Sequence, residues 1–200
     1  MQRSDTDRDG IDDFTEVTEG LDPLGGRAIP TGVIATQALN GEAKAVVVEG
    51  STTIAGRLTA FFATGSNGLA IVDASQFDKP ALLSQIALAG DSSDVDVDPT
   101  SNIAVVAAND GGLHFIDVSD SARPKRLRTA DVLASQVEVI DGIAYAAVAS
   151  QIVSYEALTG DLLNTLNIPN GATITGMARE GGGGIVKCCG GLPRVCWALG

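Results

Sequence analysis

The amino-acid sequence predicts an all-β fold in which short strands recur in groups of four. Hydrophobic residues make up 44% of the 200 residues, aromatic residues make up only 4%, and there are 24 glycines. A chain rich in Val, Ile, Ala and Gly favours closely layered strands over packed helices. No helical pattern extends beyond a few turns, and two stretches, residues 65–88 and 109–132, share one layout.

The shared layout is a strand pair around a polar turn. Each stretch opens with a glycine-containing turn, then Gly-Leu, then a short alternating strand that ends in Asp; a polar turn with Pro and another strand follow. The two copies lie 44 residues apart, counted from Gly68 to Gly112. A weaker third copy covers residues 150–168, with Glu156 in place of the Asp and a turn at residues 159–161.

Two further strands are expected before each copy. Short hairpin signals, the sequences DPTSN and DG, join the members of two of these pairs. A unit of four strands in about 40–45 residues is typical of a β-propeller blade. The predicted fold is therefore a partial β-propeller of about three four-stranded blades over residues 27–180. The expected additional strands are residues 45–50 and 58–64, 94–99 and 103–109, and 136–141 and 143–149.

Residues 171–180 are expected to open a further blade. Propellers usually have four to eight blades, so the chain is interpreted as a fragment of a longer protein or as one whose reading frame is disturbed near residue 181. We expect an incomplete ring to leave apolar faces exposed. The tail, residues 181–200, matches neither pattern, and its three cysteines (Cys188, Cys189 and Cys196) lack the spacing of a metal site.

The propeller region resembles the bacterial LVIVD repeat family. The residues that carry the resemblance are GLAIVDAS at 68–75 and GLHFIDVS at 112–119, followed by Pro80 and Pro124. The third copy departs from the pattern at Glu156. The resemblance implies a β-propeller on a secreted or surface-attached bacterial protein, mostly without assigned activity.

The first residues contain a candidate calcium loop, DTDRDGIDDFTE at 5–16. A twelve-residue calcium loop supplies oxygen ligands from positions 1, 3, 5, 7, 9 and 12, with Gly at position 6 for the turn. Gly10 occupies that turn position, and Ile11 would contribute its backbone carbonyl. A bound divalent cation would also remove the repulsion between the crowded carboxylates. The alternative is a solvated acidic linker without metal. The predicted Ca²⁺ ligands are Asp5, Asp7, Asp9, Ile11, Asp13 and Glu16.

Residues 5–24 resemble a bacterial thrombospondin type 3 repeat, because the acidic loop is followed by Gly20-Leu21-Asp22-Pro23. At most one helical turn is expected after Glu16. The resemblance implies a structural calcium-binding segment over residues 1–26 that stiffens a linker. No second acidic loop follows, so the role of Asp22 is open. Because millimolar calcium outside the cell fills weak loops, we expect an extracellular or cell-surface location.

The net charge of the chain indicates which classes of binding partner to expect. A formal net charge of −12 weighs against nucleic-acid binding, which depends on Lys and Arg neutralising phosphates. No apolar run approaches the roughly 20 residues of a transmembrane helix, and no signal peptide is visible. We expect a non-enzymatic calcium-binding protein with a propeller interaction scaffold for a protein or cell-surface ligand. The alternative is a propeller-type hydrolase or lactonase whose catalytic residues lie in missing blades.

Several other polar residues in the predicted strands are expected to have structural roles rather than catalytic or binding roles. Asp94, Asp96 and Asp98 alternate along one strand, and we interpret them as a solvated strand edge rather than a cation site or channel lining. His114 is the only histidine and is expected to be packed rather than catalytic. Asp73 and Asp117 are expected to cap the turns that follow them.

Overall fold

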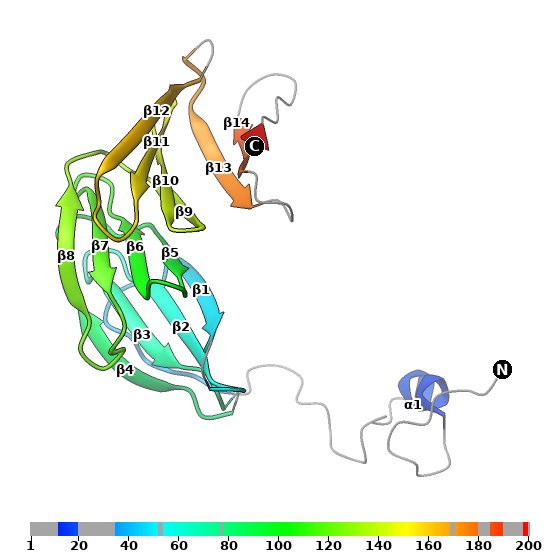
Figure 1. Ribbon diagram of the computed structural model, residues 1–200. Coiled ribbons are helices and arrows are strands. Elements are labelled where there is room, and N and C mark those ends of the chain that lie inside the picture. Colours follow the sequence, from blue (N-terminus) through cyan, green and yellow to red (C-terminus); the bar gives the residue numbers. More distant parts are fainter. Residues whose placement is uncertain are drawn as a thin grey trace. The chain divides into compact units, whose positions relative to one another are not determined.

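The computed structural model (Figure 1) describes residues 12–19, 35–51, 54–76, 78–168, 171–179, 185–189 and 198–199. The chain divides into two compact units, residues 1–36 and residues 37–200.

The described part of the first unit is the short helix α1 (Asp13–Glu19). Asp12 caps its start, because the Asp12 carboxylate accepts hydrogen bonds from the Thr15 backbone N–H at 3.1 Å and from the Thr15 hydroxyl at 2.8 Å. The helix ends about one turn after Glu16, as predicted, but it already begins inside the predicted calcium loop. No helix in the described residues has the length and apolar character needed to cross a membrane.

The second unit consists of antiparallel sheets in which strands follow one another in chain order. This arrangement confirms the predicted grouping of strands in fours, including the group that carries Glu156. The first sheet contains β1 (Ala45–Gly50), β2 (Leu58–Ala63), β3 (Leu69–Asp73) and β4 (Ala81–Ile86). The second sheet contains β5 (Asp94–Asp98), β6 (Ile103–Ala107), β7 (Leu113–Asp117) and β8 (Lys125–Ala130). The third sheet contains β9 (Gln136–Ile140), β10 (Ile143–Val148), β11 (Gln151–Glu156) and β12 (Leu162–Asn167).

A fourth sheet begins with β13 (Ile174–Arg179), the strand expected to open a further group. It pairs with β14 (Ile185–Cys189), and β14 pairs with β15 (Ala198–Leu199). Two segments of the atypical tail therefore form strands, although their sequence carries no repeat signal.

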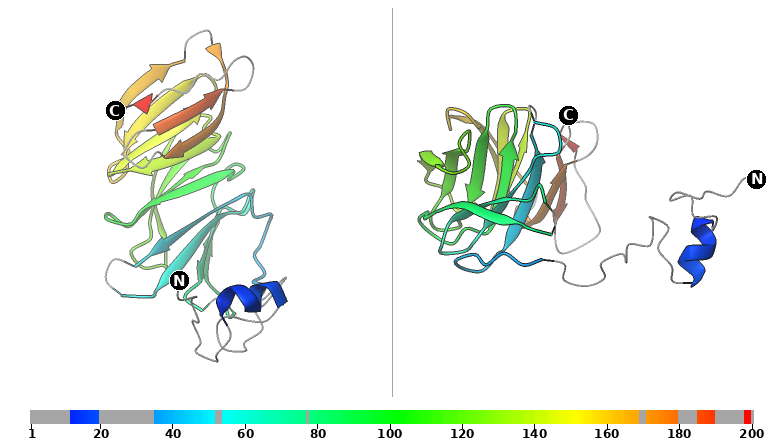
Figure 2. Two further views of the ribbon diagram at one scale, coloured as in Figure 1. Left: turned by 90° about the vertical axis from the view of Figure 1, so that its right-hand side faces the viewer. Right: turned by 90° about the horizontal axis from the view of Figure 1, so that it is seen from below.

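The sheets lie one beside the next, with the first strand of each sheet against the first strand of its neighbour (Figure 2). We call β1, β5, β9 and β13 the inner strands, and β4, β8 and β12 the outer strands. This all-β arrangement of three four-stranded sheets and one three-stranded sheet is compatible with propeller-like blades.

Apolar side chains fill the spaces between consecutive sheets. Phe61, Leu69 and Ile71 of the first sheet pack against Val95 and Val97 of β5 and their neighbours. Between the second and third sheets, Phe115 and Tyr155 meet edge to face with ring centroids 5.9 Å apart, within a cluster that includes Val137 and Val139. These layers explain why strands such as IAVVA are buried along their whole length.

Glycines at two equivalent positions explain part of the repeat. Gly68 and Gly112 precede β3 and β7 with φ of +86° and +95°. A Cβ at these positions would lie 2.2 Å from the Ile86 carbonyl oxygen and 2.5 Å from the Ala130 carbonyl oxygen. The 44-residue spacing in the sequence thus reflects a position where two strands approach too closely for any side chain.

The predicted DG hairpin is also present between β9 and β10. Asp141 and Gly142 have φ of +49° and +78°. Positive φ at both central residues is the requirement of a type I′ turn, which matches the twist of the flanking strands.

The outer strands differ in charge. β8 (KRLRTA) is basic and largely exposed, whereas β12 (LLNTLN) is fully exposed and neutral. Arg128 of β8 binds the Asp161 carboxylate at 2.7 Å and the Thr159 carbonyl oxygen at 2.6 Å. This contact connects the outer strand of the second sheet to the turn before β12.

Candidate functional site

Most of the predicted calcium ligands lie outside the described residues. Asp5, Asp7, Asp9 and Ile11 belong to this group. The two remaining ligands, Asp13 and Glu16, fall within the bounds of α1, three positions apart in the sequence.

The start of α1 suits the end of a calcium loop. Asp12 is not a predicted ligand, and its carboxylate is occupied by Thr15 at the helix N-terminus. The backbone therefore turns into a helix at the ninth loop position, Asp13. The donor set also fits: carboxylates and a carbonyl are the oxygen ligands that Ca²⁺ takes.

Asp94 and Asp96 on β5 do not form a solvated edge, so that interpretation is wrong. Both side chains are partly buried. The Asp94 carboxylate accepts a hydrogen bond from the Val137 backbone N–H at 3.0 Å, and the Asp96 carboxylate accepts one from the Val139 N–H at 2.6 Å. Both donors belong to β9, so the alternating carboxylates bridge the inner strands of two sheets. The DPTSN turn itself is present after β5.

Burial affects the ionisation of Asp94 more than its hydrogen bonds do. Desolvation raises the pKa of the Asp94 carboxyl, and the nearby Asp96 charge acts in the same direction. The hydrogen bonds from the Val137 and Val95 backbone N–H groups oppose this shift. Burial beside β9 therefore favours the protonated form of the Asp94 carboxyl.

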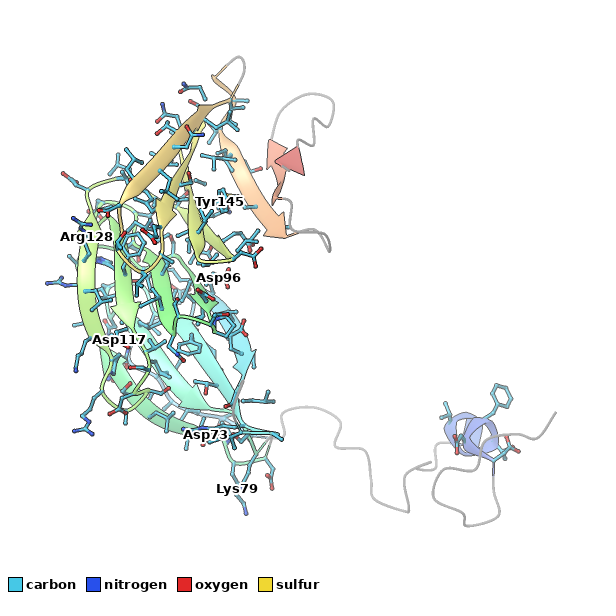
Figure 3. All side chains as sticks on the ribbon, viewed as in Figure 1. Asp73, Lys79, Asp96, Asp117, Arg128 and Tyr145 are labelled. Atoms are coloured by element: carbon cyan, nitrogen blue, oxygen red, sulfur yellow. The ribbon has the colours of Figure 1, made fainter. Side chains whose placement is uncertain are left out.

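A cavity of about 710 Å³ opens beside these strands. Its lining contains carboxylates from β1, β5 and the β9–β10 hairpin, which makes it strongly acidic. Asp96 and Asp98 were predicted to lie on a solvated strand edge, with a channel lining as the alternative. Their convergence with carboxylates of the other inner strands was not predicted, although the sequences VVVEG, DVDVDP and EVID carry acidic residues at similar positions. Figure 3 shows Asp96 on the inner-strand side of the sheets and Arg128 on the outer side. The acidic residues that line this cavity are Glu49, Asp96, Asp98, Glu138 and Asp141.

A cavity lined by carboxylates carries a negative potential, which raises the local concentration of cations. Within the described residues, no group of three His, Cys, Asp or Glu side chains is placed to hold a metal ion. Asp98 is also engaged locally, since it accepts hydrogen bonds from the Thr100 N–H at 3.0 Å and from the Ser101 hydroxyl at 2.7 Å.

A second cavity, of about 450 Å³, lies between the first and second sheets. Phe61, Leu83, Val97 and Val118 contribute apolar walls, and Arg57 is the cation in its lining. Its size falls within the range of small-molecule sites.

His114 is packed, as predicted. Its side chain is fully buried, with Nε2 2.9 Å from the Ala89 carbonyl oxygen and Nδ1 2.8 Å from the Thr129 hydroxyl. Nε2 therefore carries the proton and donates to Ala89, and Nδ1 accepts from Thr129. Burial lowers the pKa of His114, and the Arg126 charge adds to this effect.

The predicted turn caps are also present. The Asp73 carboxylate accepts hydrogen bonds from Ser75, and the Asp117 carboxylate accepts one from the Ser119 N–H at 2.9 Å. Hydrogen bonds from the side chain and then the backbone N–H of Ser75 lower the pKa of the Asp73 carboxyl, and those from the side chain and then the backbone N–H of Ser119 lower the pKa of the Asp117 carboxyl. Glu156 takes the same role in the third sheet, where it accepts a hydrogen bond from the Thr159 hydroxyl at 2.9 Å.

No protein-family model matches the sequence, and no curated protein matches it. Solved structures do resemble it. The computationally designed protein Ika4 has a TM-score of 0.60 at 14% identity, with 86% of this chain and 100% of Ika4 covered. Sqt1 from Chaetomium thermophilum, bound to the N-terminus of ribosomal protein L10, has a TM-score of 0.57 at 15% identity, with 75% of this chain and 41% of Sqt1 covered.

Hydrazine synthase from Kuenenia stuttgartiensis has a TM-score of 0.59 at 13% identity, with 80% of this chain and 45% of that chain covered. The chain thus spans all of Ika4 but less than half of Sqt1 and of hydrazine synthase. At this level of identity the likeness concerns the fold alone.

Proposed function

We propose that this is a non-enzymatic, calcium-binding surface or secreted protein. In this proposal, residues 5–16 bind one Ca²⁺, and the repeated sheets are blades of a β-propeller that presents an interaction surface. The observation that carries the proposal is the loop spacing, with an oxygen donor at every ligand position and Gly10 at the turn. The capped start of α1 at the ninth loop position supports it.

The role of the ion would be structural. Bound calcium would hold Asp13 and Glu16, at the start of α1, to the acidic residues that precede them. A linker stiffened in this way would hold the propeller away from its attachment point. The roughly millimolar calcium available outside the cell suits a weak site of this kind.

The experiment is a calcium titration of the full chain by isothermal calorimetry. Glu16→Gln removes one charge from the last ligand position, and Glu19→Gln removes one charge from the same helix outside the loop. We expect one site in the wild type, at least tenfold weaker binding in Glu16→Gln, and nearly unchanged binding in Glu19→Gln. Equal affinity of the two variants, or no binding at millimolar calcium, would contradict the proposal.

The acidic cavity favours a second candidate, a propeller-type hydrolase or lactonase. Carboxylates from consecutive sheets could supply general acid–base groups beside a substrate, together with groups from further sheets. The test is turnover of a panel of esters and lactones by the wild type and by Glu138→Gln. Activity lost in the variant would favour this candidate over the non-enzymatic one.

A further inference from the structure

We propose that the free face of the first sheet binds the fourth sheet of a second copy of this chain. This inference concerns assembly; it rests on the repetition of the sheets and is independent of calcium. The free face is defined by Val46, Val48, Leu58 and Leu82, whose exposed fractions are 55%, 52%, 41% and 38%.

Equivalent positions show that the β1 part of this face, Val46 and Val48, has no sheet among the described residues covering it. Val95 and Val97 of β5 occupy the positions of Val46 and Val48 of β1, because Val46 pairs with Phe62 as Val95 pairs with Val106. Val95 and Val97 are 4% and 5% exposed, since the first sheet covers them. In the third sheet, Val137 and Val139 are 2% and 5% exposed beneath the second sheet.

The inner strands of the three sheets therefore carry similar valine pairs and differ only in whether a preceding sheet covers the pair. The same valine pair recurs on three inner strands, and in two of them a preceding sheet buries it. Burial of the exposed part of each valine removes apolar surface from water and so favours the contact. A repeated interface that has been formed twice can form a third time with a sheet of the same kind.

The opposite end of the sheet series offers a matching face. Met177 of β13 packs towards the third sheet, so Gly176 and Ala178 on either side of it face away from that sheet. Ala178 is exposed, and a Cβ at Gly176 would meet nothing within 4 Å. Small residues also form this face of β1, where Ala45 and Val47 pack on the cluster that holds Val95 and Val97.

These two faces are different surfaces of one molecule, so their contact is heterologous. Two copies would close into a ring when the rotation between them allows it, and would otherwise extend into a filament. The residues that define both faces are uncharged, so no like charges meet among them, although each copy carries a net charge of −12.

The test compares two exposed apolar strand residues with the same exposed fraction. Val48 and Leu163 are each 52% exposed, but Leu163 lies on the outer strand β12. In sedimentation velocity from 1 to 100 µM, we expect the wild type and Leu163→Lys to associate. We expect Val48→Lys to raise the dissociation constant at least tenfold.

A second measurement removes dependence on the folding of the variant. In hydrogen exchange of the wild type, the amides of β1 and β13 should become protected as concentration rises, while those of β12 should not change. A wild type that stays monomeric at 100 µM would overturn the proposal. Association that protects β12 instead, or that Val48→Lys leaves unchanged while retaining the wild-type circular dichroism, would also overturn it.

Discussion

The Asp96 carboxylate on β5 accepts a hydrogen bond from the Val139 backbone N–H on β9 at 2.6 Å. This bond joins two sheets through a side chain, because their inner strands lie side by side without sharing a backbone ladder. Its short length and charged acceptor mark it as a strong hydrogen bond.

Replacement of Asp96 by Ala should therefore destabilise the second unit. The Val139 N–H would lose its partner, which costs about 1–3 kcal/mol. Urea denaturation followed by circular dichroism measures this loss. Asp110→Ala, an exposed aspartate in the β6–β7 turn, is the control and should change stability by less than about 0.5 kcal/mol. Equal effects of the two variants would show that the bridge contributes nothing.

Asp94→Asn should remove the titrating charge of the bridge while keeping one of the two acceptor oxygens of the side chain. The pKa of Asp94 is higher in the folded state than its unfolded value of about 3.9. At a pH between these two values, the native state therefore binds more protons than the unfolded chain. The contribution of Asp94 to stability therefore falls as pH rises through this window. The difference in unfolding free energy between the wild type and Asp94→Asn should shift in favour of the variant from pH 3.5 to pH 7. A constant difference would contradict this expectation.

His114 should make the fold sensitive to mild acid. Its folded pKa lies below the unfolded value of about 6.5, so the unfolded chain takes up the proton first. Neutral His114 therefore contributes fully to stability at a pH above its unfolded pKa. This contribution is lost as the pH falls from the unfolded pKa through the folded pKa. Thermal unfolding of the wild type and of His114→Gln between pH 7.5 and 5 should show the wild type losing more stability. Parallel curves would argue against a buried neutral imidazole.

Gly68→Ala should test the close approach of strands β3 and β4. The added Cβ would lie 2.2 Å from the Ile86 carbonyl oxygen, and φ is +86°. Gly56 provides the matched control, because it has φ of +77° but nothing within 4 Å of an added Cβ. Gly56→Ala should cost about 1 kcal/mol for the backbone conformation alone. Gly68→Ala should cost clearly more in chemical denaturation, and similar losses would show that the strands can separate freely.

The strands were predictable because their signals are local. Each signal depends only on neighbouring residues: the alternation of apolar and polar residues, the Gly-Leu turns at residues 68 and 112, and the DG hairpin. Together these signals predicted the grouping of strands in fours. The packing of His114 and the caps at Asp73 and Asp117 followed from the same local rules.

The bridge from Asp94 and Asp96 was not predictable in this way. Alternation places both carboxylates on one face of β5, but it does not state what lies opposite that face. The partners are backbone N–H groups about 43 residues further along the chain, and backbone donors leave no mark in the residue types. The acidic cavity was missed for a related reason, since its carboxylates come from separate inner strands. The calcium loop remains a prediction, because most of its ligands lie outside the described residues.

The basic strand β8 and the acidic cavity lie on opposite sides of the second sheet, so this part of the molecule has an electric dipole moment. Of the 13 Lys and Arg residues in the chain, four fall within residues 123–128. An approaching polyanion would be turned towards β8 before contact, and a polycation towards the inner strands. Screening limits this orientation to about 8 Å at physiological ionic strength, and dilution of the salt would extend its range.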